Sequence, residues 1–321
     1  MKKGIKRQLI LTMTVLVSSG LFAGCAKERQ QDQEAYRIYG ISCMDEGNYE
    51  EAVQAFQMAL NQSRGHVGAE EIDICYYKAQ AQFEQCLCED AITTYTAVID
   101  YKGYGEAYFL RGCAYMKMGQ PDLASSDFSA AVDKNPSDYE LYMRIYDVLS
   151  GNGREAEADV YLDHALEIRG DRASDKKMKG RIYMLQGDYD NAILLLKDAV
   201  AKGDLEANFY LGEAYTLYGD SEMAEASYQA YVNSDIVDCE GLYGMGVRRM
   251  EKGDYLGAVT YLTQAYEMEE VTNRQQLMRS LMIAYEYAGD FASAADLMEE
   301  YVKLYPSDEA AVREHVFLMT R

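Results

Sequence analysis

Large apolar residues recur along the chain at three- and four-residue spacing, and an alanine marks each return of the pattern. A large apolar residue follows each alanine four positions later. The spacing between successive alanines is 32 to 39 residues, and they stand at Ala52, Ala91, Ala124, Ala158, Ala192, Ala224, Ala258 and Ala294. Apolar residues three and four apart form one buried stripe on a helix. Self-similarity at this period indicates an array of stacked units.

Each unit also carries small residues at fixed places before its alanine. A small residue stands twelve positions earlier in six units, at Gly40, Ala79, Gly112, Gly180, Gly212 and Gly246. A glycine stands five positions earlier in every unit except one, where Cys86 replaces it. A glycine ends a helix by adopting the left-handed backbone conformation, and small residues let two helices approach closely. Each unit is therefore predicted to be an antiparallel helix pair, with Asn48, Asp188, Asp220, Asp254 and Asp290 capping second helices.

The pattern resembles the tetratricopeptide repeat. The unit Tyr108–Pro136 carries the resemblance most fully, at Tyr108, Gly112, Tyr115, Gly119, Ala124, Phe128, Ala131 and Pro136. The resemblance implies an all-α fold, a right-handed superhelical solenoid of about eight units over residues 35–308. Units are expected to begin near residues 33, 72, 105, 139, 173, 205, 239 and 275. Residues 309–321 are expected to form a helix that caps the apolar face of the last unit.

The first residues have the character of a targeting segment. Four basic residues precede the apolar run Leu9–Val17, which is too short for a stable membrane span. Residues 1–24 are therefore interpreted as a signal peptide. Residues 21–25 resemble a bacterial lipoprotein cleavage box, with Phe22 where an aliphatic residue is usual, and the resemblance implies lipidation of Cys25.

Lipidation would place the protein outside the cytoplasm, anchored to the bacterial cell membrane by acyl chains such as palmitate. Residues 25–34 would then be a polar, flexible tether. The alternative is ordinary secretion, with cleavage near Ala26. Under that alternative the cysteine is incidental.

Charge and cysteine content restrict the possible partners. The chain has 31 basic and 53 acidic residues, a net charge of −22, and loss of the four basic residues of the signal leaves −26. A protein with this negative charge is repelled by nucleic acid and by anionic lipid, so no nucleic-acid partner is expected. The six cysteines after Cys25 are interpreted as mostly small buried residues. Cys86 and Cys88 have the wrong spacing for zinc, and no metal or other cofactor is expected.

In tetratricopeptide arrays the first helices line a concave face, through the fifth, ninth and twelfth residues of each unit. The resemblance implies a peptide-binding set at Ile41, Met44, Tyr76, Phe83, Phe109, Met116, Met143, Met184, Phe209, Tyr243, Val247, Met250 and Ile283. Methionine and aromatic side chains adapt to varied apolar partners. The alternative is that each of these side chains simply packs against a neighbouring first helix.

Two basic residues of the same face are candidates for a different contact. Lys177 and Arg181 are four apart, hence on one side of a helix, and could take a carboxylate from a partner. Pairing with neighbouring acids of this chain is the equal alternative.

No motif of catalysis is evident, and the histidines His66, His164 and His315 fall in separate units, so an enzyme is not expected. The leading interpretation is a membrane-anchored extracytoplasmic adaptor that binds a protein or an extended peptide in its concave groove. The alternative is a structural subunit of a cell-envelope assembly, such as secretion, pilus or cell-wall machinery. Neither interpretation includes a small-molecule substrate.

Overall fold

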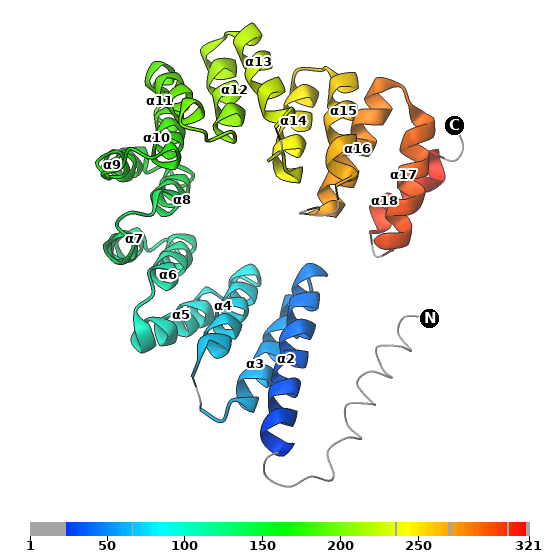
Figure 1. The fold of residues 1–321 in the computed structure, drawn as a ribbon. Coiled ribbons are helices and arrows are strands. Elements are labelled where there is room, and N and C mark those ends of the chain that lie inside the picture. Colours follow the sequence, from blue (N-terminus) through cyan, green and yellow to red (C-terminus); the bar gives the residue numbers. More distant parts are fainter. Residues whose placement is uncertain are drawn as a thin grey trace. The chain divides into compact units, whose positions relative to one another are not determined.

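The computed structural model describes residues 24–318 apart from residues 66, 235, 269, 270, 272 and 307. Over these residues it contains seventeen α-helices and no strand, which confirms the expected all-helical fold (Figure 1). None of these helices has the length and apolar character that a membrane span requires. Residues 1–23 of the expected signal peptide and the side chain of Cys25 lie outside the described residues.

The helices follow one another in pairs, and the chain divides into two compact units between Asp163 and His164. The first unit contains α2 Gly24–Asp45, α3 Tyr49–Gln62, α4 Ala69–Glu84, α5 Cys88–Lys102, α6 Gly105–Lys117, α7 Pro121–Lys134 and α8 Tyr139–Ser150, and α9 Glu155–Leu166 crosses the division. The second contains α10 Ala173–Leu185, α11 Tyr189–Ala201, α12 Ala207–Tyr218, α13 Ser221–Val232, α14 Cys239–Glu251, α15 Tyr255–Tyr266, α16 Arg274–Ala288, α17 Phe291–Leu304 and α18 Glu309–Leu318.

The recurring small residue of the sequence pattern marks the closest approach within a helix pair. A Cβ placed on Gly112 would lie 2.6 Å from the ring of Phe128, sixteen residues later. A Cβ placed on Gly212 would likewise lie 2.5 Å from the ring of Tyr228, also sixteen residues later. The first helix therefore packs its backbone directly on the large side chain that follows the marker alanine. The marker alanines themselves are fully or almost fully buried.

The turn inside each pair depends on a left-handed residue. Gly119 ends the first helix of its pair with φ +69°, and Cys86 holds the same place with φ +61°. A residue with a side chain is strained in this conformation by about 1–2 kcal/mol. In the second helix pair, packing thus holds Cys86 in a left-handed conformation that a residue with a side chain does not favour.

Four of the five expected caps on second helices are present. Asp188, Asp220, Asp254 and Asp290 each accept a hydrogen bond from the backbone N–H three residues on. The prediction for Asn48 was wrong. Its side chain makes no cap, and its amide instead donates to Glu46 over 3.1 Å.

The structure also corrects the expected tether over residues 25–34. These residues are helical, because α2 begins at Gly24 and continues to Asp45. Their glutamines, lysine, glutamates and arginine are good helix formers. The buried Gln33 further ties the helix to the next pair by donating a 2.9 Å hydrogen bond to Glu71 on α4. At the other end, α18 begins at Glu309, where the capping helix was expected, and Ala311 is buried against the second unit's core.

Candidate protein-binding groove

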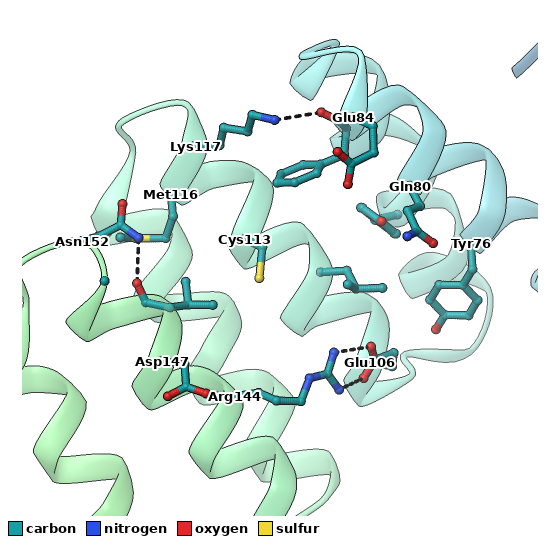
Figure 2. A pocket seen from close by; sticks show the side chains of 15 residues that line it. Tyr76, Gln80, Glu84, Glu106, Cys113, Met116, Lys117, Arg144, Asp147 and Asn152 are labelled. Carbon is teal, nitrogen blue, oxygen red and sulfur yellow. Dashed lines mark hydrogen bonds and ion pairs between the residues drawn. The ribbon is translucent and has the colours of Figure 1, made fainter. Parts of the chain in front are cut away.

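The first unit contains a hollow of about 830 Å³ that runs across three successive first helices, α4, α6 and α8 (Figure 2). Tyr95 of α5 contributes to its lining from behind these helices. A volume of this size lies in the range of ligand-binding pockets in proteins. All of its lining residues belong to the first unit.

The lining of the hollow is largely apolar. Phe83 comes from α4, Leu110 and Met116 from α6, and Val148 from α8. Figure 2 shows Cys113 of α6 among them, with its sulfur directed into the hollow. Burial raises the pKa of the Cys113 thiol to about 12, so this side chain is neutral and behaves as a small apolar group.

An ion pair links the two later helices along one side of the groove. Arg144 of α8 donates to both carboxylate oxygens of Glu106 on α6, at 2.7 and 2.8 Å. This hydrogen bonding raises the pKa of Arg144. The side chains are 43% and 44% exposed, so the pair adds only about 0–1 kcal/mol to stability. Its bidentate geometry fixes the position of the guanidinium.

A lysine links the two earlier helices in a similar way. The ammonium of Lys117 on α6 lies 4.1 Å from the centre of the Phe83 ring and donates a 3.0 Å hydrogen bond to the backbone oxygen of Phe83. Arg144 likewise lies 4.1 Å from the centre of the Phe109 ring. Each cation therefore covers an aromatic ring of the preceding first helix, about one repeat earlier in the sequence.

The structure brings together only some of the expected binding residues. Tyr76, Phe83 and Met116 line the hollow. Phe109 is only 4% exposed, beneath Arg144, and Met143 is also buried, so these two belong to the packing below the groove. Ile41 and Met44 pack against the core of the first helix pair.

The expected residues of the second unit lie outside this hollow. Phe209 belongs to an aromatic cluster with Tyr210, Tyr228 and Tyr231, at ring-centre distances of 5.3 to 6.1 Å. Met184, Tyr243 and Met250 pack against the core of that unit. Val247 is half-buried and Ile283 is exposed. Packing accounts for most of these side chains.

The two basic candidates are occupied by groups of this chain. Lys177 is ion-paired with Glu206 and with Asp204, 3.4 Å away, and its side chain is 13% exposed. The guanidinium of Arg181 lies 4.7 Å from the centre of the Tyr210 ring. Lys177 therefore follows the alternative of pairing with neighbouring acids, whereas Arg181 packs on an aromatic ring of the next first helix.

Gln80, Cys113 and Asp147 line the groove, although the sequence had not singled them out. Each is the ninth residue of its unit, the same register as Ile41. They were missed because only large apolar residues were selected at that position, whereas Cys113 is small and Gln80 and Asp147 are polar. The ninth position alone would have found all three.

The comparisons with known proteins agree with this architecture. Models of the tetratricopeptide repeat match residues 105–138, 177–237 and 243–309, about half of the chain. The chain belongs to the tetratricopeptide repeat family. None of the curated proteins matches it.

Three solved structures of other proteins are similar to this chain at low sequence identity and with TM-scores below 0.5. A protein from Parabacteroides merdae is 14% identical, with 79% of this chain and 99% of that chain covered and a TM-score of 0.46. PilW, described as a type IV pilus biogenesis factor, is 14% identical, with coverage of 65% and 97% and a TM-score of 0.44. A thermophilic protein of Thermus thermophilus is 19% identical, with coverage of 57% and 99% and a TM-score of 0.37.

Tetratricopeptide repeats serve in protein–protein interaction or as scaffolds, and proteins built from them are generally not enzymes. In the described residues, no group of three or more histidine, cysteine, aspartate or glutamate side chains is arranged to hold a metal ion. Cys43, Cys88 and Cys239 are buried, whereas Cys86 is exposed. Membership of the family indicates a role in protein–protein interaction or as a scaffold.

Proposed function

We propose that the protein is a membrane-anchored extracytoplasmic adaptor that binds a protein or extended peptide in the groove across α4, α6 and α8. The observation that carries this proposal is the hollow of about 830 Å³, with its apolar lining of Phe83, Leu110 and Met116. Such a concave apolar surface with a few fixed polar groups is typical of a binding site.

The polar groups of the groove suit an extended ligand. Glu106 and Arg144 fix one side, and Gln80 offers an amide that donates and accepts hydrogen bonds. The amide nitrogen of Asn152 already donates to the backbone oxygen of Val148 at 2.7 Å, and its amide oxygen can accept a hydrogen bond. An extended peptide carries unpaired backbone N–H and C=O groups that require such partners. The apolar lining would take its side chains.

Binding of the partner is tested by a substitution that places a larger side chain in the groove, rather than by one that removes a lining side chain. Gln80 lines the hollow and is exposed, so Gln80→Trp adds bulk there without removing a packed side chain. A photo-crosslinking amino acid at Asn152, in cells, reports what occupies the groove. The control position is Ala97, an exposed residue of α5 that does not line the hollow.

We expect one protein to crosslink from position 152, not from position 97, and to disappear when Gln80→Trp is present. Phe83→Ser should weaken the same crosslink, while Leu123→Ser, an exposed apolar residue of α7, should leave it unchanged. A crosslink that persists in both groove variants would instead favour the alternative, a structural subunit of a cell-envelope assembly that uses other surfaces.

The anchor is a separate part of the proposal and rests on the sequence of residues 21–25. Cys25→Ser should move the protein from the detergent phase to the aqueous phase on detergent partitioning, because the acyl chains attach there. Cys86→Ser changes an exposed cysteine elsewhere and is the matched control. Retention of the Cys25 variant in the detergent phase would contradict lipidation.

A further inference from the structure

The turns inside the last three helix pairs of the second unit form an edge that differs from the groove. This turn edge comprises residues 216–223, 250–257 and 286–293, which include the turn glycines Gly219, Gly253 and Gly289. Successive turns lie on the same edge because each pair rises along its first helix and returns along its second (Figure 1).

The turn edge exposes large apolar side chains. Six of them are 39 to 72% exposed, and they are Leu217, Tyr218, Met223, Leu256, Tyr287 and Phe291. Tyr255 joins the last two turns, because its ring stacks on that of Tyr287 with centres 4.8 Å apart and planes at 19°. A contiguous patch of solvent-exposed apolar side chains of this kind is typical of an interaction site.

Exposed large apolar side chains are denser at these three turns, which carry six, than at the five earlier turns of the chain, where Leu87, Leu123 and Leu185 are exposed. At the corresponding places in the first two pairs of the chain, residues 44–51 and 83–90, the exposed positions are mostly glutamate and aspartate. Leu87 is the exposed large apolar residue there. A helix-pair turn therefore does not need these side chains, and packing of the fold does not account for them.

Charge indicates what the turn edge would bind. Its three segments contain six carboxylates and a single lysine, Lys252; the acids are Asp220, Glu222, Glu251, Asp254, Glu286 and Asp290, of which Asp254 is paired at 2.9 Å with Arg249, the residue before the second segment. A second copy of this chain would bring the same acidic edge against it, and the net charge of −22 opposes self-association further. An anionic bilayer is repelled for the same reason.

We propose that the turn edge is a second docking surface, for a protein segment that combines large apolar side chains with lysine or arginine. The apolar residues of the edge supply contact area, and the acids select the basic partner. This surface shares no residue with the groove across α4, α6 and α8. The protein would thus hold two different partners, one in each compact unit.

The test begins with random peptides displayed on phage and selected on the full chain. Peptides that also bind the triple variant Leu217→Ser, Leu256→Ser, Phe291→Ser are removed by counter-selection. These three side chains are 52, 72 and 41% exposed, so the variant should keep its helical circular dichroism and melting temperature. The peptides that remain should be net basic and should contain leucine, methionine or aromatic residues.

One such peptide is then titrated by fluorescence anisotropy. The triple variant should bind it more than about tenfold more weakly than the unmodified chain. The control variant Ile38→Ser, Leu194→Ser removes apolar side chains that are 56% and 64% exposed on other surfaces, and it should bind normally. Because all of these substitutions leave the charge unchanged, non-specific attraction to an acidic protein cannot produce the difference.

Three results would overturn the proposal. Counter-selection that leaves no peptides would show that the turn edge binds none, and acidic or uncharged survivors would contradict the basic partner. Self-association of the full chain in analytical ultracentrifugation that the triple variant abolishes would make the occupant a second copy. Binding of the unmodified chain, but not of the triple variant, to phosphatidylglycerol vesicles would make it a membrane. None of these results depends on the groove, so the proposed function stands or falls separately.

Discussion

The guanidinium of Arg144 lies 4.1 Å from the centre of the Phe109 ring, and this contact covers a phenylalanine that the sequence pattern had placed on a binding surface. Arg144 is held there by Glu106 on the same helix as Phe109. The cation therefore converts an apolar position of the concave face into packed interior. The guanidinium of Arg144 itself lines the groove and presents its N–H groups there.

Arg144→Ala should uncover Phe109 and remove both the cation–π contact and the ion pair. We expect the free energy of unfolding of the first unit to fall by about 1 kcal/mol, since each interaction at a half-exposed site contributes a fraction of that amount. Urea denaturation followed by circular dichroism measures it. Lys252→Ala removes an exposed cation that makes no ion pair with any described residue, and it is the control. Equal effects of the two variants would contradict the role of the stack.

Cys86→Gly should stabilise the protein. Cys86 has φ +61°, and glycine adopts this conformation without the steric penalty of about 1–2 kcal/mol. Part of the gain is offset because glycine is more flexible in the unfolded chain. We therefore expect a gain of about 1 kcal/mol, measured as a higher melting temperature.

The reverse change, Gly119→Ala, is the matched comparison for the Cys86 variant. Gly119 has φ +69° at the same place in the next pair, so alanine should lower the melting temperature. A Cys86→Gly variant that melts lower than the unmodified chain would show that the thiol makes a favourable contact that outweighs the strain.

Gly112→Ala should be destabilising although alanine is the better helix former. The new Cβ would lie 2.6 Å from the Phe128 ring, and overpacking of this kind costs about 1–3 kcal/mol. Gly244→Ala offers the control inside α14, where the nearest atom, on the Phe209 ring, is 3.4 Å away. There the gain in helix propensity, about 0.5–1 kcal/mol, should dominate. The two alanine variants are thus expected to shift the melting temperature in opposite directions.

Asp308 should stabilise the C-terminal end in a pH-dependent way. Its carboxylate pairs with Arg279, accepts a hydrogen bond from the backbone N–H of Ala311 at 3.1 Å, and accepts another from the Tyr301 hydroxyl at 2.8 Å. These interactions lower the pKa of Asp308 to about 2, and Arg279 contributes most. Because the folded-state pKa is below the ordinary value of 3.8, the stabilisation is present above pH ~4 and is lost as the pH falls towards 2.

The comparison of Asp308→Asn with the unmodified chain isolates this charge. Thermal melts followed between pH 7 and pH 2 should show a lower melting temperature for the variant at neutral pH. The difference should shrink below pH ~4, and most of it should be lost as the pH approaches 2. A difference that is constant across this range would mean that the side chain acts only as a neutral cap on α18.

Much of the fold was predictable because each repeat carries residues on both of its helices, at fixed spacing, that form the contact between them. The spacing of twelve between Gly112 and Ala124, and of sixteen between Gly112 and Phe128, encodes one close approach of two helices. The candidate groove was predictable only in part. Tyr76, Phe83 and Met116 line it as expected, but Gln80 and Asp147 stand at a predicted register and were set aside because they are polar.

The sequence by itself therefore determined the helix pairs, their turns and most of their caps, since these depend on residues within one repeat. Only the tertiary structure decided which concave side chains remain accessible. Arg144 covers Phe109, and Asp204 and Glu206 neutralise Lys177, across distances of about one repeat along the chain. The physical reason is that long charged side chains reach neighbouring helices, and their partners are chosen by stacking geometry rather than by local spacing.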